Sequence, residues 1–210
     1  MKKLFVLVVA VLAFVSCDKV KDAMSGVAEM GDEIDYQFLS KPEEVKKWYD
    51  AIVEKSGDNA KVMDEVKFWI NRPSKEGMIK KEGEKDYLHI SIVYQDNVDK
   101  RRVEEINYFG HTSGWQVAEK KEIQVIGGGA EDFKLEDELF DFGQVTLDNF
   151  NKVMADAMKK YKDDAKYEYQ YISNVTINIV GFYVTVKGKL KSNAQEKSEY
   201  YKTDFQGNPR

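Results

Sequence analysis

The feature that most constrains the fold is an amphipathic helical pattern that occurs twice along the chain. In the first copy, one helix face carries apolar residues at i, i+3, i+4, i+7 and i+8, namely Val45, Trp48, Tyr49, Ile52 and Val53. The second copy lies 105 residues later and carries Phe150, Val153, Met154, Ala157 and Met158. We therefore predict one helix that begins near Ser40, with Ser40 as its N-cap, and ends near Gly57, and another from about Thr146 to Asp164.

Segments with the alternating pattern of half-buried strands follow each helix. These segments also match each other when the chain is shifted by 96 residues: Asp86–Tyr94 aligns with Phe182–Leu190, and Arg102–Phe109 aligns with Ser198–Phe205. The sequence predicts an α+β fold of two helix-plus-antiparallel-sheet modules in tandem, in which about three strands follow each helix. A coincidental match between two amphipathic helices is the alternative.

The predicted organisation has five parts. Residues 1–16 form a signal peptide, 17–39 a tether, 40–126 the first α+β module, 127–144 an acidic, glycine-containing linker, and 145–210 the second module. The sequence leaves open whether the two modules share one sheet.

The first seventeen residues constrain location. Lys2 and Lys3 precede the apolar run Leu4–Val15, which is shorter than the ~20 residues that a spanning helix needs. Cys17, the only cysteine of the chain, follows directly. A positive flank, a short apolar region and a small residue before the cut are typical of a secretory signal peptide.

The stretch Phe14-Val15-Ser16-Cys17 resembles the lipobox of bacterial lipoproteins, in the looser form familiar in Bacteroidota, where Phe14 replaces the usual leucine. The resemblance implies that Cys17 is acylated and becomes the mature N-terminus. Each buried methylene adds ~0.8 kcal/mol of membrane affinity, so the lipid bilayer would hold a multiply acylated cysteine. We expect an extracytoplasmic protein, lipid-anchored to the cell envelope, with the outer membrane favoured over the inner membrane. The alternative is an ordinary cleaved signal with a chance cysteine.

Composition argues against nucleic acid as a partner. The chain carries a net charge of −5 with scattered lysines, whereas phosphate-backbone binding requires clustered positive charge. Once Cys17 is acylated, no cysteine remains for a disulfide, so stability must come from burial.

The residue types that usually act in catalysis or metal binding form no recognisable motif. His89 lies in mid-strand, and His111 lies in a turn beside Thr112 and Ser113, where turn chemistry is favoured over catalysis. Gly127–Gly129 precedes acidic residues and no Gly-Lys-Ser/Thr, which excludes a phosphate loop. The acids of residues 131–141 match no EF-hand spacing. We predict no catalytic residue, no cofactor and no metal.

Aromatic side chains are the most suggestive feature of the body, because seven of the twelve tyrosines lie in the last fifty residues. The candidate binding surface consists of Tyr167, Tyr169, Tyr171, Tyr183, Tyr200, Tyr201 and Trp115. Tyr167, Tyr169 and Tyr171 alternate along one strand and are predicted to share a face toward the second helix. Core packing is the favoured interpretation, and a concave aromatic sheet that binds a protein or a glycan is the alternative.

Helix-then-meander modules in tandem resemble secreted bacterial proteins of the PepSY-like and β-lactamase-inhibitor-like kinds. The closing stretch Asp204-Phe205-Gln206-Gly207-Asn208 is similar to the Asp-x-x-Gly turn that often ends PepSY-type modules. The resemblance implies a non-enzymatic binding, inhibitory or scaffolding module with a protein partner in the envelope. The alternative is a carboxylate-dependent hydrolase of cell-envelope or dietary polysaccharide, which would need two facing carboxyl groups.

Overall fold

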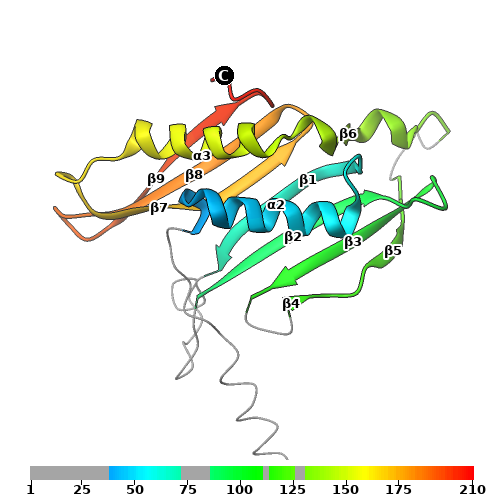
Figure 1. Cartoon of the computed structure of the whole chain (residues 1–210), viewed down its shortest axis with the longest axis horizontal. Helices are drawn as coiled ribbons and strands as arrows, with labels where there is room; N and C mark the ends of the chain where they lie inside the picture. The colour runs from blue at the N-terminus through cyan, green and yellow to red at the C-terminus, as the bar shows by residue number, and fades with distance from the viewer. Residues whose placement is uncertain (1–37, 72–85, 111–113, 126–130) are drawn as a thin grey trace, which may run out of the picture.

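A computed structural model describes residues 38–71, 86–110, 114–125 and 131–210. They form an α+β fold in which two α-helices pack on a 9-stranded antiparallel sheet (Figure 1). The predicted α+β class is confirmed. Cys17, His111, Gly127–Gly129, the signal peptide and nearly all of the tether lie outside the described residues.

The elements have the following bounds. The helical elements are η1 (Phe38–Ser40), α2 (Pro42–Ser56), η3 (Leu135–Glu138), η4 (Phe142–Gln144) and α3 (Leu147–Tyr161), of which the three η elements are 3₁₀ turns. The strands are β1 (Lys61–Asn71), β2 (Tyr87–Gln95), β3 (Arg102–Phe109), β4 (Gly114–Trp115), β5 (Glu119–Glu122), β6 (Leu139–Asp141), β7 (Tyr167–Asn178), β8 (Gly181–Leu190) and β9 (Glu196–Thr203).

Both helices lie close to their predicted positions, but their N-termini differ. At α3 the Thr146 hydroxyl accepts a hydrogen bond from the Asn149 N–H at 3.2 Å, as expected of an N-cap. At α2 the predicted cap, Ser40, is wrong, because Ser40 ends η1 and Lys41 occupies the N-cap without a side-chain bond. Pro42 fixes φ in the first turn, where a missing N–H costs nothing.

One sheet contains the strands that follow both helices. Its order is β4-β3-β2-β1-β7-β8-β9, with β5 also paired to β3 and β6 to β1. The junction is the antiparallel pair β1–β7, in which Phe68 lies opposite Val175. The question that the sequence left open is therefore answered by a single continuous sheet.

β1 changes partners along one edge. Lys61–Met63 pairs with β6, and the part from Glu65 onward pairs with β7. The register of β1 against β2 shifts between Met63 and Val66, and Asp64 has a φ of 60°. An extra residue with positive φ bends a strand, which lets two short partners share the edge of β1.

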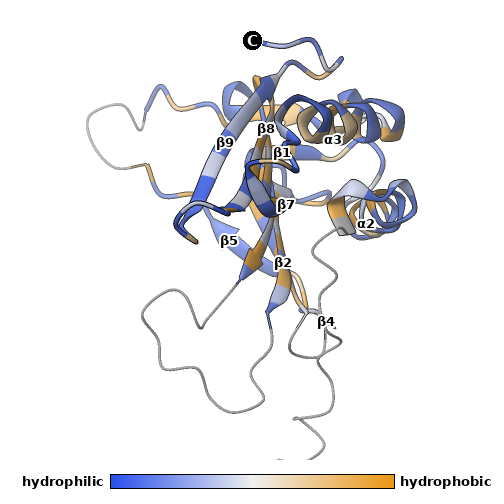
Figure 2. Ribbon diagram, turned by 90° about the vertical axis from the view of Figure 1, so that its left-hand side faces the viewer, coloured by the Kyte–Doolittle hydropathy of each residue, from blue (hydrophilic) through white to orange (hydrophobic). Residues whose placement is uncertain are grey.

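The core lies between the sheet and the two helices, which cover the same face (Figure 2). Phe150 of α3 lies 5.5 Å from Phe68 and 5.7 Å from Phe182, measured between ring centroids. The apolar stripes predicted from helical spacing supply the contacts of both helices. The buried helical residues are Val45, Trp48 and Ile52 of α2, and Phe150, Val153, Met154 and Ala157 of α3.

The described part of the predicted linker, residues 131–144, packs into the body. Leu135, Phe140 and Phe142 are buried, and β6 adds three residues to the edge of β1. Phe142 also stacks on Tyr49 of α2, with ring centroids 5.8 Å apart. Apolar residues spaced among the acids anchor this acidic segment to the core.

Gly181 provides a test of the β8–β9 pairing. Its φ is +125°, and an added Cβ would lie 2.1 Å from the Thr203 carbonyl oxygen. We expect Gly181→Ala to lower the free energy of unfolding by ~3 kcal/mol or more, because both the backbone conformation and the backbone contact must change. Gly57→Ala is the matched control: its φ is +95° and its Cβ would meet open space, so ~1 kcal/mol is expected. Equal losses in urea unfolding of the two variants would contradict this account.

Candidate functional site

One face of the sheet is covered by α2 and α3, and a hollow lies on the opposite face. Side chains of successive strand residues point to opposite faces, so the sequence neighbours of core residues point away from the helices. In Figure 2 both helices lie on the same side of the sheet. The hollow has a volume of about 440 Å³, within the range of small-ligand sites. Its outward-facing lining residues are Trp69, Asn174, Thr176, Tyr183, Thr185, Lys187, Ser198, Tyr200 and Lys202.

The strand register places these residues side by side. Tyr183 of β8 lies between Thr176 of β7 and Lys202 of β9, and Thr185 lies opposite Tyr200. The Lys202 ammonium is 4.9 Å from the centroid of the Tyr183 ring. The hollow therefore spans β1, β7, β8 and β9, and presents aromatic rings beside hydroxyl, amide and ammonium groups.

The polar groups of the hollow are hydroxyls, an amide, an indole N–H and two ammonium groups, so the hollow is polar and positively charged. Its lining contains neither Asp nor Glu, so it offers no carboxylate pair to a glycosidic bond. Lys67 pairs with Glu65, and Lys189 with Glu168 at 2.6 Å. Lys187 and Lys202, by contrast, have no carboxylate partner in the part of the chain that the structure describes.

The predicted candidate tyrosines divide between the two faces. Tyr183 and Tyr200 line the hollow, and Tyr200 is 66% exposed. Tyr201 borders it too, but lies opposite Val184 with its ring against Lys160 of α3, and it is buried. Tyr169 is exposed, whereas Tyr167 and Tyr171 are buried.

The prediction that Tyr167, Tyr169 and Tyr171 share a face is wrong. The register of β7 against β8 shifts between Tyr167 and Tyr169, so the simple alternation fails there. Tyr167 and Gln170 approach the same side of Gly188, where a Cβ would lie 2.6 and 2.7 Å from them. The Gln170 amide bonds to Tyr161 O and Asp163 N at the end of α3, which fixes that side as the helix-covered one.

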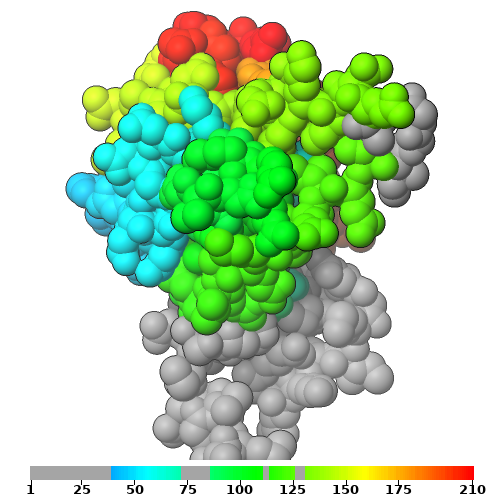
Figure 3. Space-filling view, turned by 90° about the vertical axis from the view of Figure 1, so that its right-hand side faces the viewer, coloured from blue at the N-terminus to red at the C-terminus, as the bar shows by residue number. Residues whose placement is uncertain are grey.

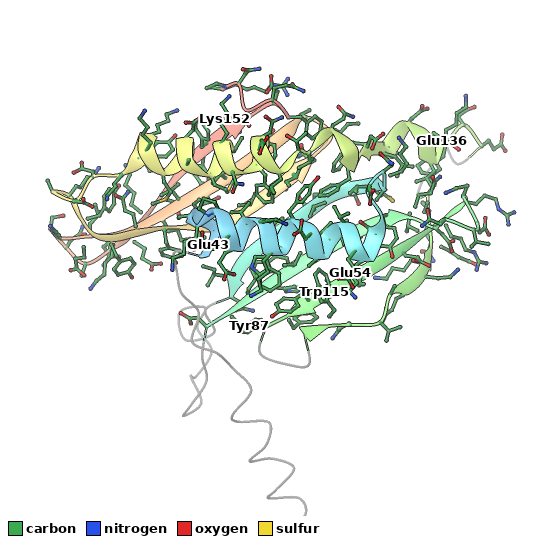
Figure 4. The ribbon with its side chains drawn as sticks, viewed as in Figure 1. Glu43, Glu54, Tyr87, Trp115, Glu136 and Lys152 are labelled. Atoms are coloured by element: carbon green, nitrogen blue, oxygen red, sulfur yellow. The ribbon has the colours of Figure 1, made fainter. Side chains whose placement is uncertain are left out.

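Trp115 lies away from the hollow. It pairs with Tyr108 on β3, and its ring is 5.4 Å from the Tyr108 ring, which is in turn 4.8 Å from Trp48 of α2. Figure 4 shows Trp115 beside α2 at the edge of the sheet. Its inclusion among the candidate binding residues is therefore not supported by proximity to the hollow.

A second aromatic group lies further along the sheet face that carries the hollow, called here the uncovered face because none of the described helices lies on it. The His89 ring is 3.7 Å from Trp69 and 4.0 Å from Phe109 between centroids, and its Nε2 is 3.3 Å from Asn107 Oδ1. These contacts place His89 on a strand face, as its mid-strand position predicted. Among the described residues, no group of three His, Cys, Asp or Glu could hold a metal ion.

Sequence reasoning missed Trp69, Asn174, Lys187 and Lys202 as lining residues. The alternation Tyr183, Thr185, Lys187 was a usable signal, because the same strand places Phe182, Val184 and Val186 in the core. Asn174 lies just past the second register shift of β7, which follows Ile172, and no sequence pattern predicts that shift.

The most strongly perturbed carboxyl group has a structural role. Asp96 begins the turn between β2 and β3. Green segments, which include this turn, lie at the end of the molecule seen in Figure 3. Asp96 accepts hydrogen bonds from Lys120 Nζ at 2.6 Å and from the N–H of Val98 at 2.7 Å. The Lys120 contact is the main cause that lowers the pKa of Asp96 to about 2. A fixed anion of this kind holds β5 to the turn and is unsuited to donate a proton.

Comparisons with family models, with curated proteins and with solved structures found no match. None of the described helices is both long enough and apolar enough to cross a bilayer.

The Asp96 contacts predict an acid dependence. Because folding lowers the pKa of Asp96 from 3.8 to about 2, the unfolded chain binds more protons between these values. The stability that Asp96 contributes is complete above about pH 4 and is lost as the pH falls toward 2. We expect Asp96→Asn to lower the melting temperature at pH 7 and to reduce its slope between pH 4 and 2.

Asp132→Asn is the control for this prediction, because Asp132 is exposed and forms no ion pair with the part of the chain that the structure describes. Differential scanning calorimetry across the pH range measures both variants. Identical slopes for Asp96→Asn and the unmodified protein would contradict the role given to Lys120.

Proposed function

We propose that this chain is a lipid-anchored, extracytoplasmic binding module that docks a protein partner in the cell envelope, as an inhibitor or a scaffold. The observation that supports the proposal is the hollow on the uncovered face of the sheet. Side chains with rigid rings and polar tips are enriched at protein interfaces, and this face carries Tyr183, Tyr200 and Trp69 together.

The anchor is argued from residues 1–17 alone. Cleavage before Cys17 and acylation of its thiol would leave residues 17–37 between the bilayer and the first described residue. A chain of this length reaches at most ~70 Å when fully extended, at ~3.3 Å per residue. The body could therefore contact proteins on the membrane surface or well above it.

Two repeated modules, 40–126 and 145–210, are part of the proposal. α2 and α3 each have 15 residues, and their first residues, Pro42 and Leu147, are offset by the 105 residues that the sequence suggested. The offset of 96 keeps Leu88 and Ile90 on the core face with Val184 and Val186, but would match buried Ile106 to exposed Lys202. The similarity to PepSY-like and β-lactamase-inhibitor-like proteins therefore rests on element order, and is closest over the helices and second strands.

The adjacency of β1 and β7 explains why a repeated architecture would serve binding. Antiparallel pairing of the two first strands merges two small sheets, and the hollow crosses this junction from Trp69 on β1 to Lys202 on β9. Neither set of three strands alone would present the whole surface. We propose that the partner docks across the junction.

Site-specific photocrosslinking tests the docking face. A photoreactive phenylalanine analogue at Tyr200, which is 66% exposed in the hollow, should capture a discrete protein in envelopes of the native host. The same group at Ala155, an exposed position of α3 on the helix-covered side, is the matched control and should not capture it. Capture from Ala155 alone, or no capture at either position, would contradict the proposal.

Metabolic labelling with an alkyne fatty acid tests the anchor independently. The full chain should take up the label and remain in the membrane fraction. Cys17→Ala should lose the label and accumulate as the uncleaved precursor, because the acylated thiol is the attachment point. Equal labelling of the two proteins, or release of the unmodified protein to the soluble fraction, would be the contrary result.

A further inference from the structure

We infer that the cationic strip on the uncovered face binds an extended, acidic peptide segment of the partner. The cationic strip is defined as Lys187, Lys202 and Arg210 with Tyr183, Tyr200 and Val180. This inference rests on the proposed function and names the chemistry of the segment that docks.

Two adjoining hollows give the strip its shape. The hollow of about 440 Å³ is joined by a second of about 150 Å³, lined by Val180, Tyr183, Lys202, Thr203 and Arg210. Tyr183 and Lys202 line both, so the two hollows lie next to each other beside the first half of β8. From Val180, in the turn before β8, to Lys187 the backbone advances seven residue steps, or roughly 24 Å at ~3.4 Å per step. A segment of about seven extended residues matches that length.

The strip is positively charged because its lysines are not neutralised by carboxylates. Lys187 and Lys202 have no ion pair with any carboxylate of the described residues, whereas Lys67 and Lys189 on the same face are each paired. The chain as a whole carries a net charge of −5, so an unneutralised cationic patch is unusual on it. Such a patch attracts anionic groups and steers their approach.

Arg210 continues the positive charge at the end of the strip. Its guanidinium donates to the Val180 carbonyl at 2.7 Å, and its backbone N–H donates to the Lys202 carbonyl at 3.0 Å. Asp204 interacts electrostatically with Arg210, but it also accepts hydrogen bonds from Gln206 N, Asn208 N and Asn208 Nδ2 in its own turn. The guanidinium is thus positioned by backbone contacts, with further N–H groups left for a ligand.

Spacing and apolar contacts favour a peptide over an acidic polysaccharide. Tyr183, Thr185 and Lys187 recur every second residue, so their spacing of ~6.8 Å equals the same-face repeat of an extended peptide. At the Arg210 end, Val180 is 39% exposed and Ile179 is 55% exposed. This end can accept an apolar side chain, which a polysaccharide does not supply. The expected ligand is therefore acidic at alternate positions, with an apolar residue at one end.

A displayed library of random dodecapeptides, panned on the full-length protein in nanodiscs, tests this inference and does not require the partner to be identified first. Enriched sequences should carry Asp or Glu at alternate positions and an apolar residue at one end. Their synthetic copies should bind about tenfold more weakly to Lys187→Gln/Lys202→Gln, and binding should weaken as salt rises. Lys100→Gln/Lys159→Gln removes the same charge from exposed positions outside the strip, and should leave affinity unchanged.

Neutral or basic enriched sequences, or equal binding to both double variants, would overturn the inference. So would a library that yields nothing while polygalacturonate binds, since that result assigns the strip to an anionic glycan. The two proposals can fail separately. If the photocrosslinked partner of Tyr200 is still captured by Lys187→Gln/Lys202→Gln, the proposed protein docking stands and the acidic segment is wrong. If Tyr200 captures no partner, the proposed function itself fails.

Discussion

β1 is the strand on which the rest of the structure depends. It pairs with β2 along one edge and with β6 and β7 along the other. β1 therefore joins the strands on the β2 side of the sheet to those on the β7 side. Its inward residues Val66 and Phe68 are fully buried beneath the helices. Phe68 contacts Phe150 of α3, so the strand that follows α2 also packs against the other helix. Loss of β1 would separate the two halves and open the core between them.

The sequence predicts most of the helices and long strands, because apolar side chains repeat at a spacing that differs between helices and strands. α2 and α3 were predicted within a few residues, since each buries one stripe at helical spacing. β2 and β3 were likewise predicted from alternation. The β1–β7 pairing could not be predicted from the sequence. It joins residues more than 100 positions apart, and no local pattern specifies the partner of a strand. The short strands β4 and β6 have too few residues for a period.

Of the tyrosines singled out from the sequence, Tyr183 and Tyr200 line the hollow, whereas the predicted common face of the β7 tyrosines is wrong because the strand is irregular there. Tyr167 and Tyr171 were assigned a common face because alternation was assumed through a register shift. Trp115 is an aromatic residue near a strand end, and its ring joins Tyr108 beneath α2. Lys187 and Lys202 were overlooked because isolated lysines on strands are common. Their lack of carboxylate partners among the described residues becomes visible only when the faces are assembled.

The two outer strands of the sheet decide how another protein can reach it. On β9, the carbonyls of Tyr200 and Lys202 already accept hydrogen bonds from the Tyr161 hydroxyl and the Arg210 N–H, and Thr203 forms a bridge with Pro209. On the opposite side, β4 and β5 pair with β3, and all four residues of β5 are exposed charges. Occupied or charged edges resist strand addition. Among the described residues, both outer edges are thus guarded against edge-to-edge polymerisation, so crowding of many copies is not expected to join their sheets into fibres.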